Sequence, residues 1–101
     1  MTLGSVALDV TLRVRLYVAS ESPNSVAALR NLHAVLAGRP TLQVDLEVID
    51  LLREPERGLL DRVLFTPMLV RIAPGPERRL LGNLGNRDAL MNVLGLEELA
   101  P

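Results

Sequence analysis

The sequence predicts an α/β domain of order βαβ-α-ββ-α, in which helices on both faces of a central sheet make three layers. Two segments that alternate between apolar and polar residues, 10–18 and 42–49, are separated by one helix-length segment, which is typical of a βαβ unit. Two further short strands flank a turn that contains two prolines. With 101 residues, 49% of them apolar, the chain can form one core, and we expect one domain over residues 10–101 after a loose N-terminus, residues 1–9.

The two alternating strands are expected to be parallel neighbours, because a helix connects them and such crossovers are right-handed. Arg13 and Arg15 then lie on the same face of the sheet as Asp45 and Glu47. Opposite charges on adjacent strands contribute about 0.2–1 kcal/mol per pair. A parallel strand covered on both faces would be apolar throughout. This polar face is therefore predicted to be only partly covered, by a short helix.

The helix between these strands, expected over residues 23–37, has clear signals at both ends. Ser22 can be its N-cap and Pro23 its first residue, because proline lacks an N–H that the first turn would leave unpaired. Gly38, followed by Arg-Pro, ends the helix. Its apolar face is predicted to carry Val26, Leu29, His33 and Leu36.

The second half of the chain is predicted to contain a short helix, two antiparallel strands and a last helix capped by Asn86. These elements are expected over residues 56–64, 68–72 and 78–81 and from Asn86 to about Leu99. The apolar side of the short helix is predicted to carry Leu59, Leu60, Val63 and Leu64. The complete order is that of the thioredoxin-like fold, in which a cis-proline opens the third strand. We therefore expect a cis bond between Thr66 and Pro67.

The residue types predict no catalytic, cofactor-binding or metal site. Residues 20–25 occupy the position of the thioredoxin active loop, but the chain has no cysteine, and the thiolate is the reactive species in that chemistry. A lone histidine, His33, supplies no metal ligand set, and we expect it to be a half-buried structural residue. The serines of the loop have no nearby base to activate them. We expect a protein that is not an enzyme.

Composition also limits the partners. The net charge of −1 creates no general field for phosphate or anionic lipid, and Tyr17 and Phe65 are the only aromatic rings on which a base could stack. No apolar segment approaches the roughly 20 residues of a membrane span. The first nine residues lack the features of a secretory signal. We expect a cytoplasmic protein that binds neither nucleic acid nor membranes.

Several segments together resemble the KaiB family of circadian clock proteins. They occur in the family's order and spacing from about Leu12 to Leu96. The matching segments are Leu16-Tyr17-Val18-Ala19, Pro23-Asn24-Ser25-Val26, Ala28-Leu29, Val48-Ile49-Asp50, Pro55, Thr66-Pro67, the Pro74/Pro76 turn with Arg78-Arg79, and Gly82-x-Leu84-x-Asn86-Arg87.

This resemblance implies a non-enzymatic adaptor that binds KaiC, a hexameric RecA-like ATPase, and modulates its ATPase activity or phosphorylation state. It also implies two folds: a thioredoxin-like form that binds KaiC, and a tetrameric resting form in which the last helical segment becomes a strand. Docking is expected through the first helix and the second strand, and a homo-oligomer, dimer or tetramer, is possible. The expected partner-binding residues are Arg13, Arg15, Tyr17, Asn24, Arg62, Arg71 and Arg79.

Three departures from the family pattern refine this expectation. Glu21 adds a negative charge to the loop before the first helix. Ala27 and Glu47 stand where cyanobacterial members usually carry basic residues, which puts a KaiA-type partner in doubt. Val93 replaces a family glycine, and glycine within a helix costs about 0.5–1 kcal/mol relative to alanine. The last change favours the helical, thioredoxin-like state, although Gly95 reintroduces a weak point.

Two alternatives remain at this point. A stand-alone scaffold module of the same fold, acting outside any clock, would lack a KaiC-type partner. A redox enzyme of the thioredoxin type is disfavoured by the missing cysteines.

Overall fold

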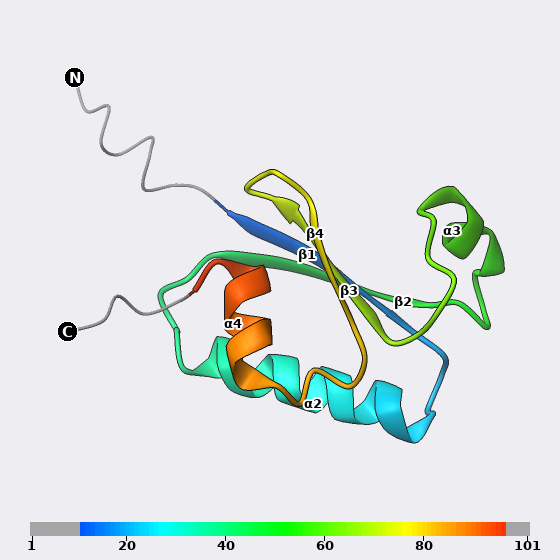
Figure 1. The fold of residues 1–101 in the computed structure, drawn as a ribbon, viewed down its shortest axis with the longest axis horizontal. Helices are drawn as coiled ribbons and strands as arrows, with labels where there is room; N and C mark the ends of the chain where they lie inside the picture. The colour runs from blue at the N-terminus through cyan, green and yellow to red at the C-terminus, as the bar shows by residue number, and fades with distance from the viewer. Residues whose placement is uncertain (1–10, 97–101) are drawn as a thin grey trace.

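The computed structural model describes residues 11–96. The predicted N-terminal segment 1–9 and the end of the predicted last helix, residues 97–99, lie outside this range. A four-stranded sheet of order β2-β1-β3-β4 is flanked by three helices (Figure 1). The elements are β1 (Leu12–Val18), α2 (Pro23–Ala37), β2 (Val44–Asp50), α3 (Pro55–Leu60), β3 (Met68–Ala73), β4 (Arg78–Leu81) and α4 (Arg87–Leu94).

The strands pair as the thioredoxin-like layout requires. β1 is parallel to β2 and antiparallel to β3, and β3 is antiparallel to β4. The predicted shared face is confirmed, and in the observed register Arg13 lies opposite Asp45 and Arg15 opposite Glu47. Their side chains form ion pairs, at 3.4 Å and 3.3 Å. The peptide bond before Pro67 is cis, as predicted.

Two apolar clusters fix the layers. The larger one lies between the sheet and the helices α2 and α4, which cover the same face (Figure 1). Its fully buried members include Leu16, Leu32, Leu69 and Leu90. The smaller cluster lies on the opposite face, beneath α3 and the turn that follows it, and consists of Tyr17, Ile49, Val63 and Val70. The expected partial cover of the second face is therefore present.

The short helix differs from the prediction. α3 ends at Leu60 rather than at residue 64, and Leu59, Leu60 and Leu64 are exposed instead of forming a buried side. The chain leaves the helix because Arg62 adopts a left-handed conformation, with φ of 58°. Only Val63 turns inward, so a helical period drawn through residues 59–64 assigned the wrong face.

The last helix is also shorter than predicted. α4 ends at Leu94, because Gly95 takes a left-handed conformation with φ of 73°. The Gly95 N–H donates to Asn92 O and the Leu96 N–H to Met91 O, which closes the helix end. The residue described at sequence level as a weak point inside the helix is therefore its C-terminal stop. Asn86 is the N-cap, as predicted: its side chain accepts from Ala89 N.

Candidate protein-docking site

A groove of about 710 Å³ lies between α2 and β2, the strand at one edge of the sheet. We call it the α2/β2 groove. Its apolar floor consists of Val18, Val26, Leu29 and Val48. Its polar lining consists of Ser20, Glu21, Ser25, Arg30, His33, Asp50 and Arg53. An apolar floor with charges of both signs around it is the composition of a protein-contact surface.

Local structure explains why this apolar floor faces solvent. α2 directs Ser25, Ala28, Leu32 and Val35 against the sheet, so the neighbouring helix face turns toward the edge of β2. On β2, Val48 shares the α2 face of the strand with Val44 and Leu46 by the two-residue period, and no strand of residues 11–96 covers that edge. Val26 and Val48 each remain 44% exposed.

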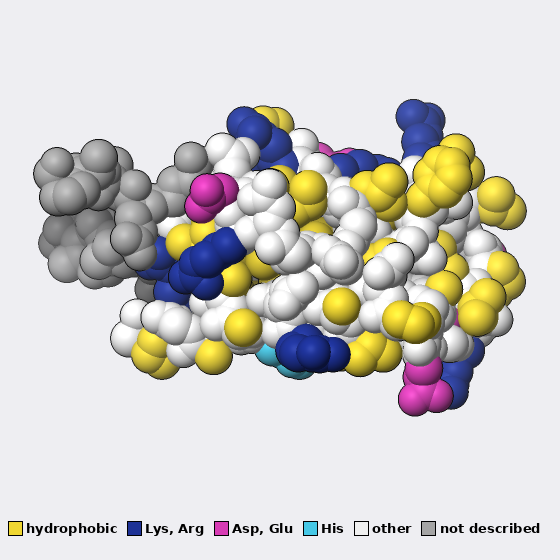
Figure 2. Space-filling view, turned by 60° about the horizontal axis from the view of Figure 1, so that its bottom comes forward, with side chains coloured by type: hydrophobic (Ala, Val, Ile, Leu, Met, Phe, Trp, Pro, Cys, Tyr) yellow, Lys and Arg dark blue, Asp and Glu magenta, His cyan; other side chains and the backbone are white. Residues whose placement is uncertain are grey.

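His33 lies in this groove, and the prediction of its burial was wrong. It was predicted to be half-buried on the apolar face of the helix, but it is exposed. The helix face buried against the sheet is one residue further round, at Leu32 and Val35. Figure 2 shows the histidine at the surface beside an arginine side chain.

Asp50 holds the loop at one end of the groove. Its carboxylate accepts from Ser20 N at 3.0 Å, from Ser20 Oγ at 2.8 Å and from Leu52 N at 3.0 Å. The hydrogen bond from the Ser20 hydroxyl, with those from the two backbone groups, lowers the pKa of this carboxyl. Ser20 has a φ of 47°, a conformation that these contacts hold in place. The β1–α2 loop is thereby tied to the end of β2.

Ser22 and Ser25, at the position of the thioredoxin active loop, stabilise the start of α2. Ser22 is the N-cap of α2, and its Oγ accepts from Ser25 N. Pro23 is the first residue of the helix, as predicted. Ser25 is 2% exposed, and its Oγ accepts from Ala19 N at 3.0 Å and from the Ser22 hydroxyl at 2.8 Å. The hydroxyls of Ser22 and Ser25 are thus used in hydrogen bonds within the loop and the helix start, at the position where a thioredoxin carries its reactive thiols.

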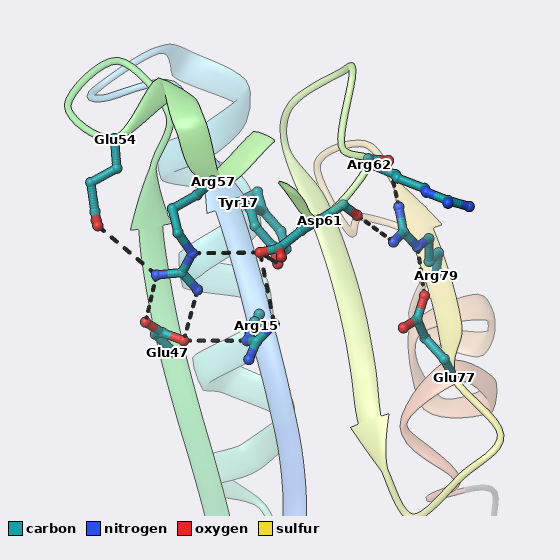
Figure 3. A network of polar contacts seen from close by, with 9 residues as sticks. All are labelled: Arg15, Tyr17, Glu47, Glu54, Arg57, Asp61, Arg62, Glu77 and Arg79. Atoms are coloured by element: carbon teal, nitrogen blue, oxygen red, sulfur yellow. Dashed lines mark hydrogen bonds and ion pairs between the residues drawn. The ribbon is translucent and has the colours of Figure 1, made fainter. Parts of the chain in front are cut away.

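A second group of polar side chains lies on the opposite face of the sheet (Figure 3). Tyr17 donates its hydroxyl to Asp61 Oδ2 at 2.5 Å, and Arg57 makes two hydrogen bonds to Glu47, at 3.2 Å and 3.3 Å. Arg15 lies 3.3 Å from Glu47 and 3.7 Å from Asp61. We call these five residues the Tyr17–Asp61 network. It joins β1 and β2 to α3 and the turn after it.

Charge and burial shift the titration of this network. The Tyr17 hydroxyl, followed by the nearby Arg15 and Arg57 guanidinium groups, lowers the pKa of Asp61. Burial, together with the hydrogen bond to Asp61, raises the pKa of Tyr17. The hydrogen bonds from Arg57 lower the pKa of Glu47. All these shifts follow from structural contacts, so perturbed titration here is no sign of catalysis.

The structure separates the seven expected partner-binding residues. Asn24 is exposed near the start of α2, and Arg13 is also exposed, in its pair with Asp45. Arg15 belongs to the Tyr17–Asp61 network. Arg79 donates to the carbonyl oxygens of Asp61 and Arg62, at 2.6 Å and 2.8 Å. Arg62 is exposed.

Two of the seven are buried, so the expectation that they lie on a partner surface is wrong for this state. Tyr17 is 1% exposed beneath α3. Arg71 is 8% exposed and donates to Pro76 O at 3.1 Å, while its Nε has no partner within residues 11–96. Neither Arg62, Arg71 nor Arg79 borders the α2/β2 groove, whose basic residues are Arg30 and Arg53 instead.

Sequence reasoning named the first helix and the second strand as the docking elements, but it did not single out Arg30, Asp50 or Arg53 in the groove between them. Arg30 and Arg53 are ordinary surface positions in the pattern, and Asp50 appeared only as part of a matching segment. One signal was available: an acidic residue at the end of a parallel strand can accept from the neighbouring loop, because strand ends and loops meet at that edge. Within the described range, no group of three His, Asp or Glu side chains could hold a metal ion.

The fold and this site define a thioredoxin-like domain with no thiol at the loop position and with an apolar groove beside its edge strand. Residues 15–96 match the family model described as the KaiB domain. The chain belongs to the KaiB family. This membership relates its function to circadian clocks and agrees with the expectation of a protein that is not an enzyme.

Proteins named circadian clock oscillator protein KaiB are similar over most of their length. The one from Prochlorococcus marinus (strain MIT 9211) is 40% identical over 89 residues, covering 86% of this chain and 78% of that protein. The one from Thermostichus vulcanus is 39% identical, covering 88% and 82%.

Solved structures show the same fold. The N-terminal domain of Synechococcus elongatus SasA matches with a TM-score of 0.69 at 27% identity, covering 90% of both chains. Chloroplastic thioredoxin z matches with a TM-score of 0.70 at 22% identity, covering 90% of this chain and 81% of that one, which supports the fold alone. No helix of residues 11–96 is long and apolar enough to cross a membrane.

Proposed function

We propose that this protein is an adaptor that docks on a KaiC-type hexameric ATPase through the α2/β2 groove and modulates the ATPase activity or phosphorylation state of that enzyme. The observation that carries the proposal is an open apolar groove beside a free edge strand, in a domain of the KaiB family. The loop that would carry a redox centre is used for helix capping instead.

The groove offers two kinds of contact to a partner. Val26 and Val48 supply apolar area that a partner side chain can cover. The outer edge of β2 supplies backbone groups that can pair with an extended segment. Arg30 and Arg53 at the rim would affect the association rate and its salt dependence more than the final affinity.

The charge of the β2 region favours one kind of clock partner over another. Glu47 is engaged by Arg15 and Arg57, so this part of the strand presents paired charges instead of a basic surface. A KaiA-type partner that needs basic residues at positions 27 and 47 would find alanine and glutamate. The proposed partner is therefore the ATPase, without a KaiA-type protein.

The test is co-precipitation of the purified chain with the KaiC homologue of the same organism, with ATP and without nucleotide. We expect ATP-dependent association and a changed ATPase rate. Val48→Glu should weaken association by about 100-fold, because it places a charge on the apolar floor.

Asn92→Glu is the matched control, since it adds the same charge at an exposed position of α4 outside the groove, and it should bind like the wild type. If the wild-type protein fails to associate with the ATP-loaded homologue, the proposed function is wrong, and a scaffold role outside a clock takes its place.

A further inference from the structure

A smaller cavity, of about 320 Å³, lies on the face of the sheet that α3 covers, between the turn after α3 and β4. Val70 and Ile72 of β3 form its apolar floor, and Leu60 of α3 lies at its rim. Its polar lining consists of Arg15, Tyr17, Asp61, Arg62, Glu77 and Arg79. We call this cavity the Arg62 cleft. Small-molecule sites have volumes of about 300–1,000 Å³, so the cleft has room for a small organic molecule.

The two carboxylates of the Arg62 cleft already have partners. Asp61 accepts from the Tyr17 hydroxyl, and its Oδ2 lies 3.7 Å from Arg15 Nη1. Glu77 accepts from Arg79 Nε at 2.9 Å. Because the lining holds three arginines and two acidic residues, these pairings leave one positive charge without a counterpart.

Arg62 carries this remaining charge. It is exposed, and its side chain makes no ion pair or hydrogen bond within residues 11–96. Figure 3 shows Arg62 beside Arg79, on the other side of β3 from Tyr17 and Arg15. All five N–H groups of its guanidinium are therefore available to a ligand.

Arg79 both shapes the cleft and keeps donors for a ligand. Its Nη1 donates to Arg62 O at 2.8 Å and its Nη2 to Asp61 O at 2.6 Å. These bonds fix the backbone where Arg62 has its left-handed φ of 58°. Since a guanidinium has five N–H groups, two of Arg79 remain after its bond to Glu77 is also counted. Holding this backbone in place before a ligand arrives lowers the entropic cost of binding.

We infer that the Arg62 cleft binds a small organic oxyanion, whose phosphate or carboxylate group pairs with Arg62 and Arg79 while its apolar part contacts Leu60 and Ile72. The parallel N–H donors of a guanidinium match the oxygen atoms of either group. The unpaired charge of Arg62 favours an anion over a neutral molecule. The apolar floor and rim favour an organic anion over a bare inorganic ion.

The inference goes beyond the proposed function, because no lining residue of the Arg62 cleft borders the α2/β2 groove. Oxyanion binding and ATPase docking can therefore fail independently. One unpaired charge and a small apolar contact area favour a modest affinity, so we expect a dissociation constant of about 1 mM for a simple probe.

The test is a titration of the ¹⁵N-labelled full chain with phenyl phosphate and with benzoate at low salt, followed by amide chemical shifts. At least one of the two anions should give saturable shifts at residues 60–62, 70–72 and 77–79. The pair of probes shows which oxyanion group the cleft accepts. Benzyl alcohol, which has the ring without the charge, should give no saturable shifts at these positions.

Arg62→Gln should weaken binding of the preferred anion by about 10-fold, because it removes the unpaired charge and its hydrogen bonds to the ligand. Arg30→Gln is the matched control: it removes the same charge from an exposed position of α2, outside the cleft, and should keep the affinity within about twofold. The amide spectrum of each variant checks that it is folded.

Three results would overturn the inference. One is the absence of saturable shifts at the cleft with either anion up to about 20 mM. Another is equal weakening by Arg62→Gln and Arg30→Gln, which would mean that the anions follow net charge alone. The last is binding of benzyl alcohol as tight as that of the anions.

Discussion

Asp50 shows how one side chain determines the shape of the candidate site. Asp50 accepts three hydrogen bonds from the loop and turn that flank the groove. The alternating pattern that predicted β2 did not predict these contacts. Tyr17 shows the opposite case. Period two assigned it to the polar face, and the structure does place it there, but Val63 and the turn after α3 bury that end of the face. Neither the Ser20–Asp50 contact nor the Tyr17–Asp61 contact follows from local pattern, because these pairs lie 30 and 44 positions apart in the sequence.

Asp50→Asn is expected to lower the thermal midpoint of unfolding at pH 7 and to loosen the β1–α2 loop. Because its contacts lower the pKa of Asp50 in the folded state, its carboxylate stabilises the fold above the unfolded pKa of about 3.9. This contribution is lost as the pH falls through the lower, folded pKa.

Thermal unfolding at pH 7 and in steps from pH 5 to pH 2.5 checks this. The difference between wild type and variant should shrink toward the acid end. A constant difference across the range would show that the charge of Asp50 is not what matters.

Tyr17→Phe is expected to lower the free energy of unfolding by about 1 kcal/mol at pH 7, since it removes the hydrogen bond to Asp61 while Arg15 and Arg57 remain. Since burial raises the pKa of Tyr17 in the folded state, the stabilising effect of the neutral phenol is complete below the unfolded pKa of about 10. It is lost as the pH rises through the folded pKa.

Urea unfolding from pH 7 to pH 11 measures this directly. The wild type should lose stability above about pH 10 more steeply than the variant. Equal slopes would mean that Tyr17 ionises freely and that the Asp61 contact is absent in solution.

At the scale of elements, the sequence predictions were most accurate where neighbouring residues alone determine the structure. Ser22 and Pro23 predicted the start of α2, and the alternation along β1 and β2 predicted that their charged residues share one face of the sheet. Prediction failed at the ends of α3 and α4, where a left-handed residue stops the helix. A non-glycine residue such as Arg62 gives no warning of this, whereas Gly95 could be taken as either a helix interior or a stop. The groove forms between α2 and β2, so the sequence pattern of neither element alone predicts it.

Gly95→Ala is expected to destabilise the protein by about 1–2 kcal/mol. Its φ of 73° is unfavourable for an L-residue, and a Cβ there would lie 2.9 Å from Arg71 Nη1. Gly38→Ala is the matched control, because Gly38 ends α2 with an ordinary φ of −74°. Denaturant midpoints compare the two. Equal effects of both substitutions would argue against Gly95 as the stop of α4.

At the scale of the whole molecule, both the groove and the buried last helix depend on the thioredoxin-like fold. The thioredoxin-like arrangement places α4 beside α2, on the same face of the sheet, with Leu90, Met91, Val93 and Leu94 buried. The resting form that the family resemblance implies would turn this segment into a strand and remove that packing. Val93 is 8% exposed in this helix, and valine favours the helical state over the glycine that the resemblance leads us to expect at this position.

Backbone chemical shifts of Asp88 to Leu94 distinguish the two forms. Helical values are expected for the main species in solution. Strand-like values for this segment would mean that the resting form dominates and that the surfaces described above belong to a minor state.

Hydrogen exchange of the chain alone and bound to the ATP-loaded KaiC homologue tests whether the ATPase docks at the α2/β2 groove. We expect slower exchange in the β1–α2 loop and most of α2, residues 20–33, and in β2 and the turn after it, residues 44–53, with residues 59–65 unchanged by the ATPase. Protection confined to residues outside the α2/β2 groove, with 20–33 and 44–53 exchanging as in the free protein, would contradict it.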